Sequence, residues 1–315
     1  MYVALYHNAK AGLREFTLEE IARLFRDEHH EVDVFSRGEH PTDAAIASDA
    51  EVIIAAGGDG TVAAMARALW QHRSNIPLYV LPLGTANNVA WSLGLTDVVP
   101  SLVRGLASAR EARLDIGLIE SGEHKAPFLE AAGSGFLGAA LHNEFTARAR
   151  TLRKANRATA LPSSRDARVR EAARSIARRI RRAPTLSYEV LADGADLSGD
   201  YIAIAAMNIR AIGPRMRLAP DANSADGLLD LVLVRPEARH ALATLIELQD
   251  EVRAPTIDCR RVQDVELSWP GHGYRDDDPW PPGDALASAR HVHLCVGGSV
   301  RLLLPTCCLE LNRGI

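Results

Sequence analysis

Short apolar runs alternate with helical patterns over the first 115 residues of the chain. Tyr2–Tyr6 has the pattern of a buried strand, and apolar side chains at helical spacing follow it from about Leu13. Further strands are predicted at Val32–Phe35, Val52–Ala56 and Leu78–Leu81, and further helices at Thr61–Trp70, Ala86–Leu93 and Val98–Leu106. This alternation predicts an α/β domain whose parallel sheet is covered by helices on both faces.

After Asp115, strand-like stretches dominate the chain. One helical and basic insertion, at about 141–182, interrupts them, and the proline-rich segment Asp278–Pro282 is expected to be a loop. The predicted strands are Phe128–Ala132, Leu186–Leu191, Tyr201–Met207, Leu228–Val234, Val262–Trp269 and His291–Val296. This part of the chain therefore predicts a second, mainly antiparallel domain.

Composition agrees with two folded domains. The 315 residues are more than one hydrophobic core usually holds, and 47% hydrophobic with 24% charged residues excludes global disorder. A net charge of −4 gives no general attraction to nucleic acid. The four cysteines have neither metal-ligand spacing nor the pattern of a disulfide framework, which favours a reducing compartment; they are Cys259, Cys295, Cys307 and Cys308.

Membrane-spanning and secretory segments are not expected. No apolar run approaches the ~20 residues that span a bilayer. The opening Met1–Tyr6 lacks a basic start and is too short for a signal peptide. We therefore expect a soluble, cytoplasmic protein whose contact with membrane is peripheral.

A glycine loop joins the predicted strand Val52–Ala56 to a helix, and it reads Gly57-Gly58-Asp59-Gly60-Thr61. Glycines let backbone N–H groups approach phosphate oxygens, and the dipole at a helix N-terminus favours their charge. An aspartate among phosphates needs a divalent cation or a substrate hydroxyl beside it, as in Mg–ATP binding or general-base catalysis. Alone, the loop is more simply a tight turn that Asp59 caps.

A second loop repeats this design after the next strand, and it reads Pro82-Leu83-Gly84-Thr85-Ala86-Asn87-Asn88-Val89-Ala90. Neighbouring parallel strands end at the same edge of a sheet, where ligands bind, so Thr85, Asn87 and Asn88 are expected to contact the same nucleotide. The second loop alone would indicate only a helix start. The chain lacks Gly-x-x-x-x-Gly-Lys-Ser/Thr, which excludes a P-loop NTPase, and lacks Gly-x-Gly-x-x-Gly after its first strand, which disfavours a dinucleotide oxidoreductase.

Together with the earlier Asn8-Ala9-Lys10-Ala11-Gly12, these loops resemble the diacylglycerol kinase catalytic domain family. That family includes bacterial lipid kinases and sphingosine kinases and is more distantly related to NAD kinases and phosphofructokinases. The resemblance covers nearly the whole chain and implies an α/β nucleotide-binding domain with a parallel sheet, a β-sandwich domain, and ATP between them. We accordingly assign residues 1–117 and the returning segment 298–315 to an ATP-binding domain, and residues 118–297 to a lipid-substrate domain.

The resemblance also implies individual ATP contacts. Asn8 and Gly12 match a phosphate-facing turn, in which Ala9 replaces the family's usual proline, and Ser36 matches a further nucleotide contact. The implied ATP-binding residues are Asn8, Gly12, Ser36, Gly57, Gly58, Asp59, Gly60, Thr61, Gly84, Thr85, Asn87 and Asn88.

Some of the carboxylates that the family uses near its metal are replaced by other residues in this chain. Asp115 matches a carboxylate that joins Asp59 in a metal and water network. The family often has aspartate where this chain has Asn88, and an Asn-Glu pair where it has Ala63-Ala64. An amide at position 88 lowers the negative charge of the network, so weaker Mg2+ binding is expected there.

Two further acidic segments match the family's motifs. Pro220–Leu228 resembles a turn in which Mg2+ is bound by the side chain of Asp226 and the carbonyls of Asn223 and Leu228; a plain Asp-Gly turn before a strand is the alternative. In the late Asp276-Asp277-Asp278-Pro279, Asp278 takes the position of the family's catalytic glutamate, with a side chain one methylene shorter. A plain acidic loop is the alternative there.

The implied reaction is attack of a lipid hydroxyl on the γ-phosphorus of ATP, with Mg2+ and the Gly57–Gly60 amides spreading the charge and Asp59 or Asp278 taking the proton. An NAD kinase-like enzyme and a non-catalytic lipid- or nucleotide-binding protein are the alternatives. The Asn87-Asn88 pair and the Asp226-Gly227-Leu228 turn favour the lipid branch. Diacylglycerol, phosphatidylglycerol, a sphingoid base and a polyprenol stay open as substrates, as does a homodimer.

Basic residues are concentrated between Thr146 and Arg182, a segment that contains thirteen basic and two acidic residues. Near an anionic membrane each arginine contributes about 1 kcal/mol, so this segment is a candidate for membrane docking. Apolar contact on one side is expected from Leu152, Val169, Ile176 and Ile180. A solvated helical pair is the alternative, because 33 of the 36 basic residues of the whole chain are arginine. Interleaved aromatic residues are absent from the segment, which argues against single-stranded nucleic acid.

Overall fold

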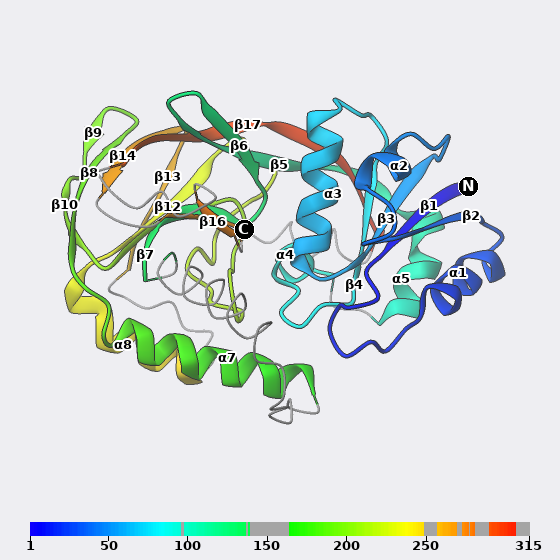
Figure 1. Cartoon of the computed structure of the whole chain (residues 1–315), viewed down its shortest axis with the longest axis horizontal. Coiled ribbons are helices and arrows are strands. Elements are labelled where there is room, and N and C mark those ends of the chain that lie inside the picture. The colour runs from blue at the N-terminus through cyan, green and yellow to red at the C-terminus, as the bar shows by residue number, and fades with distance from the viewer. Residues whose placement is uncertain are drawn as a thin grey trace. The chain divides into compact units, whose positions relative to one another are not determined.

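The computed structural model describes residues 1–95, 98–136, 138, 164–248, 257–269, 273–276, 278–280 and 290–306. The chain divides into two compact units, Met1–Ile116 with Gly298–Ile315, and Gly117–Gly297. Strands β5 (Arg110–Ser121) and β17 (Arg290–Leu304) run from one unit into the other, as the ribbon in Figure 1 shows.

The first unit is built on a parallel sheet with strand order β2-β1-β3-β4. Its strands are β1 (Tyr2–His7), β2 (Glu31–Ser36), β3 (Val52–Gly57) and β4 (Leu78–Pro82). Leu302 of β17 pairs in parallel with Leu78 of β4. Every residue of β3 and β4 is buried, which explains why these strands are continuous apolar runs in the sequence.

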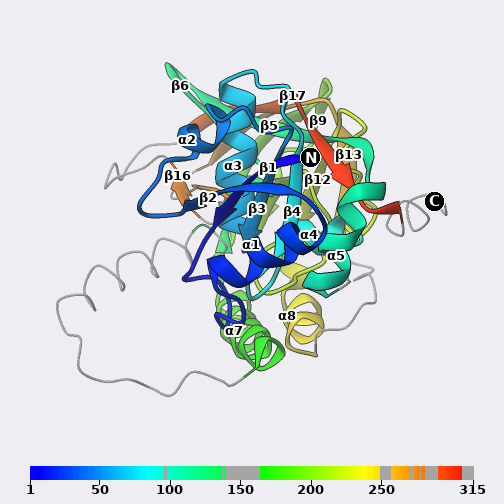
Figure 2. The same ribbon diagram turned by 90° about the vertical axis from the view of Figure 1, so that its right-hand side faces the viewer.

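Helices cover both faces of this sheet. Helices α1 (Leu18–Asp27) and α5 (Val99–Gly105) lie side by side on one face, and α2 (Thr42–Ile46) and α3 (Asp59–Gln71) lie on the other (Figure 2). The chain leaves β1 toward β2 in one direction and then crosses to β3 in the other. Right-handed crossovers therefore place the two pairs of helices on opposite faces. The short elements α4 (Asn88–Ser92) and η1 (Leu106–Ser108) complete the unit.

Two helices begin at residues other than those predicted. Helix α1 begins at Leu18, not near Leu13, because a capping box fixes its start: the Thr17 side chain accepts the Glu20 N–H at 3.2 Å, and Glu20 accepts the Thr17 N–H at 2.7 Å. Helix α3 begins at Asp59, two residues earlier than predicted, so the glycine loop is partly helical.

The second unit contains two antiparallel sheets, and with the parallel sheet of the first unit they confirm the predicted fold class. One sheet has the order β13-β12-β11-β7-β15-β16, with β13 (Ile257–Val262), β12 (Leu229–Val234), β11 (Ala203–Met207), β7 (Ala131–Gly135), β15 (Gly273–Arg275) and β16 (Asp278–Trp280). The other contains β10 (Gly199–Tyr201), β8 (Leu186–Ala192), β14 (Asp264–Trp269), β17, β5, β6 (His124–Phe128) and β9 (Ala195–Asp196).

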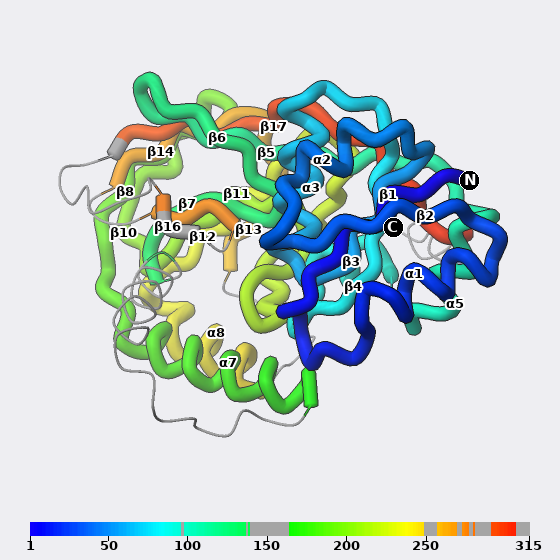
Figure 3. Tube along the Cα trace, turned by 45° about the vertical axis from the view of Figure 1, so that its right-hand side comes forward, coloured from blue at the N-terminus to red at the C-terminus, as the bar shows by residue number. Residues whose placement is uncertain are grey.

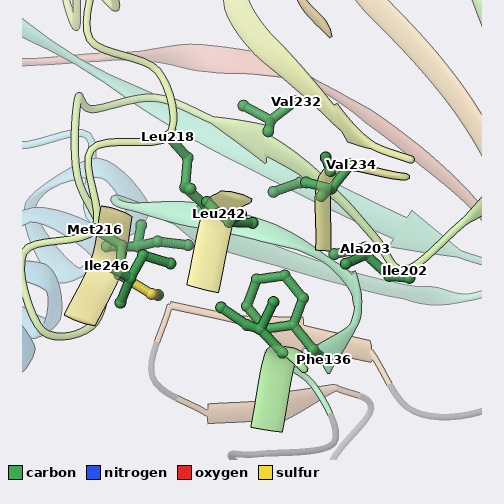
Figure 4. Packing of buried hydrophobic residues seen from close by; sticks show 14 of the residues in the cluster. Phe136, Ile202, Ala203, Met216, Leu218, Val232, Val234, Leu242 and Ile246 are labelled. Carbon is green, nitrogen blue, oxygen red and sulfur yellow. The ribbon is translucent and has the colours of Figure 1, made fainter. Parts of the chain in front are cut away.

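The six-stranded sheet is buried on both faces. Ile204 and Ala206 of β11 face the other sheet, whereas Ala203, Ala205 and Met207 face helices α7 (Arg165–Ile180) and α8 (Arg239–Leu248). Figure 4 shows part of this helix-side core, where side chains of β12 pack near those of α8. Alternate residues of a strand point to opposite faces. Because both faces of β11 are buried, all its residues are apolar and the strand is a continuous apolar run in the sequence.

Helix α7 lies beside α8 (Figure 3) and turns its apolar face inward. Val169 and Ile180 are buried, and Ile176 packs against the helix-side core. Burial leaves Val169 and Ile180 unavailable for the predicted membrane contact, and Ile176 is partly covered by the same core. The other predicted apolar contact, Leu152, lies outside the described residues, as do the basic positions from Arg148 to Arg157.

Several predicted strand boundaries are also wrong. Phe128–Ala132 is not one strand, since β6 ends at Phe128 and β7 begins at Ala131 in the other sheet. Val262–Trp269 is likewise divided, because the chain changes sheets at Gln263. Pro279 lies in strand β16, within the segment expected to be a loop; β16 is an edge strand, where proline is tolerated. Within the described part of the chain, no helix is both long and apolar enough to cross a bilayer.

Candidate active site

Three loops of the first unit meet at the carboxyl edge of its parallel sheet. The strand order reverses direction between β1 and β3, and ligands of α/β folds bind at such a switch point. Backbone hydrogen bonds join the three loops there. The Asn8 N–H donates to the Ala56 carbonyl at 3.0 Å, and the Leu83 N–H donates to the Gly57 carbonyl at 2.8 Å.

The loops touch through glycines. A Cβ on Gly58 would lie 3.0 Å from the Gly84 Cα, and a Cβ on Gly84 would lie 2.6 Å from Asn87 Oδ1 and closer still to the Gly58 Cα. Gly12 has a φ of +49°, and its Cβ would overlap the Leu83 carbonyl oxygen. Backbone therefore packs directly against backbone, which explains the glycine in each of the three loops.

Gly60 differs from these glycines. A Cβ on Gly60 would meet nothing within 4 Å, and its backbone is that of the second residue of helix α3. Alanine is preferred to glycine inside helices by about 1 kcal/mol, so the fold alone gives no reason for glycine at this position.

Thr61 links its own glycine loop to the turn at Asn8 and to Arg37, which follows β2. It is buried, and its Oγ1 accepts hydrogen bonds from Asn8 Nδ2 at 3.1 Å and from Arg37 Nη1 at 2.9 Å. A side chain on Gly57 would collide with it, the Cβ lying 2.6 Å from the Thr61 Cβ. The sequence indicated Asn8 and Thr61 but not Arg37. The only sequence signal for Arg37 was its position directly after the predicted nucleotide contact Ser36. The Ser36 N–H itself donates to His40 Nδ1 at 3.1 Å.

Asp59 joins the first glycine loop to the second. It is the first residue of α3, and its Oδ1 accepts the Val89 N–H of α4 at 2.9 Å. Burial raises the pKa of this carboxyl above its ordinary value, and the backbone N–H groups of Val89, Asn88 and Asn87 oppose that rise. Asp59 therefore does not cap α3, whose N-cap is Gly58; its carboxylate accepts an N–H at the start of α4 instead.

The second loop is closed by its own asparagine. Asn87 has a φ of +54°; its Oδ1 accepts the Gly84 N–H at 2.8 Å, and its Nδ2 donates to the Gly84 carbonyl at 3.2 Å. Helix α4 therefore begins at Asn88, later than predicted, and Asn88 is buried. Thr85 is partly exposed beside it, and Asp115 is buried in strand β5.

In the second unit, the turn predicted to bind Mg2+ is formed differently. Asp226 Oδ1 accepts the Leu228 N–H at 3.0 Å, and Asp226 Oδ2 forms an ion pair with Arg261 of β13. Asn223 Oδ1 accepts the Ala225 N–H at 3.2 Å. A divalent cation on Asp226 would have to displace the Arg261 guanidinium.

Arg261 also lies directly across the sheet from Asp230. Asp230 is buried, and its pKa is raised to about 6, first of all by burial and also by Asp226 and Asp221, whereas Arg261 and the Cys259 thiol lower it. Arg261 thus offsets the negative charge of both Asp226 and Asp230 near this turn.

The late acidic motif lies at the other end of the six-stranded sheet. Asp276 has a φ of +50°, and its Oδ1 accepts the N–H groups of Leu129 and Glu130 at 2.9 and 2.7 Å. Asp276, the first acid of the motif, therefore anchors the chain just before β7. Asp278 pairs with Arg275 in the β15–β16 ladder.

Two buried polar residues beside this anchor were missed by the sequence reasoning. Glu130 is 2% exposed and Asn208 is 1% exposed. Asn208 Nδ2 donates to the Leu129 carbonyl at 2.9 Å, and the Asn208 N–H donates to the Glu130 carbonyl at the same distance. The available signal was a polar residue inside each of two apolar runs, Phe128–Ala132 and Tyr201–Ile209.

Two family models match the chain. Residues 2–119 match the diacylglycerol kinase catalytic domain, and residues 145–300 match the YegS C-terminal NAD kinase beta sandwich-like domain. A probable lipid kinase YegS-like protein of Xanthomonas campestris is 27% identical over 282 residues, which cover 84% of this chain and 82% of that protein. Its counterpart in Pseudomonas putida is 26% identical over 263 residues, or 80% of each chain. A match to the Klebsiella pneumoniae protein is 34% identical but spans only 43% of that protein's length.

Solved structures share the fold. A diacylglycerol kinase from Bacillus anthracis superposes with a TM-score of 0.65 at 15% identity, covering 98% of each chain. An NAD kinase from Archaeoglobus fulgidus, in complex with ATP, superposes with a TM-score of 0.55 at 12% identity, covering all of this chain and 98% of that one. At these identities the likeness concerns the fold alone.

Proposed function

We propose, since the chain belongs to the diacylglycerol kinase catalytic domain family, that it transfers the γ-phosphate of ATP to the hydroxyl of a diacylglycerol-like lipid. The observation that carries this proposal is the meeting of three glycine loops at the switch point of the parallel sheet. Such a surface of bare backbone suits a polyphosphate, because N–H groups reach its oxygens without intervening side chains.

Gly60 supports a ligand at that surface. Nothing in the fold requires glycine at the second residue of α3, and the position is open for 4 Å around its missing Cβ. A phosphate seated on the N-terminus of α3 would account for it, since a methyl group there would keep the phosphate away from the backbone.

In the proposed reaction, the amides of Gly57–Gly60 and the α3 dipole stabilise charge on the transferred phosphoryl group. ATP enters as its magnesium complex. Asp59 and Asp278 are the candidates for accepting the hydroxyl proton. The raised pKa of Asp59 makes it a stronger base than an ordinary carboxylate, but its Oδ1 is already used by the Val89 N–H.

Membrane contact is the second part of the proposal. An exposed ridge of arginines runs along α7 and just beyond it at four-residue spacing, formed by Arg170, Arg174, Arg178 and Arg182. Four such residues near an anionic bilayer contribute on the order of 4 kcal/mol. Arg181, by contrast, is paired with Glu247 at 2.5 Å and does not belong to the ridge.

A transfer screen tests the kinase. The full chain is incubated with γ-labelled ATP and Mg2+ against a total bacterial lipid extract, against diacylglycerol micelles and against NAD, and the labelled product is identified by mass. Asp43→Asn, an exposed acid of α2, is the control for handling and folding. A phosphorylated lipid supports the proposal. Label in NAD alone would move the chain to the soluble-substrate branch, and ATP binding without label in any acceptor would leave a non-catalytic protein.

A further inference from the structure

Three potential metal ligands lie together on the outer face of the second unit's other sheet. They are Asp264 of β14, and His293 and Cys295 of β17. Asp264 is the cross-strand partner of Cys295, and His293 is two residues from Cys295, so all three side chains share one face. Val292 and Leu294, which alternate with His293 and Cys295 along β17, are buried in the core, and this fixes the register of β17 and hence that face.

The ligand atoms are close enough to bind one ion. One oxygen, one nitrogen and one sulfur of the three residues lie within 4.8 Å of one another, and His293 Nε2 is 2.5 Å from Asp264 Oδ1. A tetrahedral zinc ion with bonds of about 2.0 Å to nitrogen and about 2.3 Å to sulfur separates its ligand atoms by about 3.5 Å. Small side-chain rotations on a fixed pair of strands bridge the difference.

The second nitrogen of His293 provides an independent indication. Its Nδ1 lies 3.9 Å from Glu120 Oε2, on strand β5, which pairs with β17. A metal-binding histidine usually donates its other N–H to a carboxylate, which orients the ring. Here one ring nitrogen faces Asp264 and the other faces a carboxylate on the opposite side.

The local charge favours a cation. Asp264 and Glu120 both place negative charge near Cys295, and Lys125 is the opposing cation, held in an ion pair with Glu120. Thiolate, imidazole and carboxylate together form a ligand set suited to zinc.

We propose that Asp264, His293 and Cys295 bind one zinc ion, with Glu120 orienting His293 and water as the fourth ligand. The thiol of Cys295 loses its proton to solvent on binding, so the thiolate and the Asp264 carboxylate balance the charge of Zn2+. The ion would clamp β14 to β17 and stabilise the folded protein. This site is independent of the proposed kinase reaction.

Zinc titration of the full chain tests the proposal. Metal-free protein competes with a chromophoric chelator for ZnCl2, without ATP or Mg2+, and Co2+ is used in parallel because Co2+–thiolate bonds give a charge-transfer absorption. Wild type should bind one Zn2+ tightly and show that absorption. Cys295→Ser and His293→Gln should each weaken binding by about 100-fold or more, and Glu120→Gln by about tenfold.

Cys259→Ser is the matched control, since it removes the other cysteine of the described part of the chain and lies away from the cluster. It should keep the full affinity and the Co2+ absorption. The proposal is overturned if wild type binds no zinc at micromolar concentration, or if Cys259→Ser and Cys295→Ser lower the affinity equally. A melting temperature of Cys295→Ser that rises with zinc as much as that of wild type would also overturn it.

Discussion

Gly84→Ala and Gly60→Ala form a matched pair that separates glycines needed by the fold from glycines needed by a ligand. Both lie in the glycine loops, and each substitution adds one methyl group. At Gly84 the methyl would lie 2.6 Å from Asn87 Oδ1 and closer to the Gly58 Cα, which is backbone and cannot turn aside. At Gly60 it would meet nothing within 4 Å.

The expected stability changes have opposite signs. Ordinary contacts to a Cβ begin near 3.4 Å, so the two loops around Gly84 must separate by most of an ångström. Overpacking of this kind costs about 1–3 kcal/mol. Gly60→Ala replaces glycine by alanine in the first turn of α3 and should leave the free energy of unfolding unchanged or raise it by up to about 1 kcal/mol.

Urea unfolding of the apo protein, followed by circular dichroism, measures the first effect, and ATP binding and transfer measure the second. We expect Gly60→Ala to fold as well as wild type and yet to lose ATP affinity by at least tenfold. Full ATP affinity in Gly60→Ala would show that no phosphate binds at the N-terminus of α3. A Gly84→Ala protein as stable as wild type would show that the loops do not pack through their glycines.

Four other outcomes follow from the geometry. Asp59→Asn should abolish transfer while the fold survives, because the amide oxygen can still accept the Val89 N–H but an amide cannot take a proton at neutral pH; unchanged turnover against the Asp43→Asn control would exclude Asp59 from the mechanism. Asp230 has its pKa raised from 3.8 to about 6, so the folded state favours its protonated form, and stability is lost as pH rises through about 6. Asp230→Asn should therefore raise the free energy of unfolding by about 1–2 kcal/mol at pH 8, solvent and Arg261 screening part of the full effect, and by nothing near pH 4; an equal gain at both values would contradict this. Replacing the four ridge arginines of α7 by glutamine should reduce sedimentation with anionic vesicles at low salt, whereas Arg260→Gln should not; equal sedimentation of both would refute membrane docking through α7. Millimolar Mg2+ without ATP should leave the urea midpoint of wild type unchanged and raise that of Arg261→Ala; a shift in wild type would show that Mg2+ displaces the guanidinium from Asp226.

The first unit was predictable from sequence because its chemistry is local. Strands β3 and β4 are buried on both faces and therefore stand out as apolar runs, and the two glycine loops directly follow them. The start of α1 also has a local signal, because Thr17 followed three residues later by Glu20 is the pattern of a capping box. Apolar spacing alone placed the start of this helix too early. The late start of α4 was not readable, because it depends on the left-handed backbone of Asn87.

The second unit was less predictable because its decisive contacts join distant parts of the chain. Asp276 anchors the Leu129 and Glu130 amides across about 147 residues of sequence, and no local pattern announces that pairing. The change of sheets at Gln263 is equally hidden, since β13 and β14 form one unbroken strand pattern in the sequence. Helix α8 was not predicted at all, although its apolar face packs on the six-stranded sheet.

Two features lower the negative charge of the segments that resemble the family's acidic motifs. Asn88 is a buried amide where the resemblance implies a carboxylate, and the Asp226 carboxylate forms an ion pair with Arg261. Each leaves less negative charge for a divalent cation to balance. Asp59 remains, and its Oδ1 accepts the Val89 N–H, while backbone N–H groups around it favour its charged form. We therefore expect the Mg2+ of the proposed transfer to arrive on the phosphates of ATP.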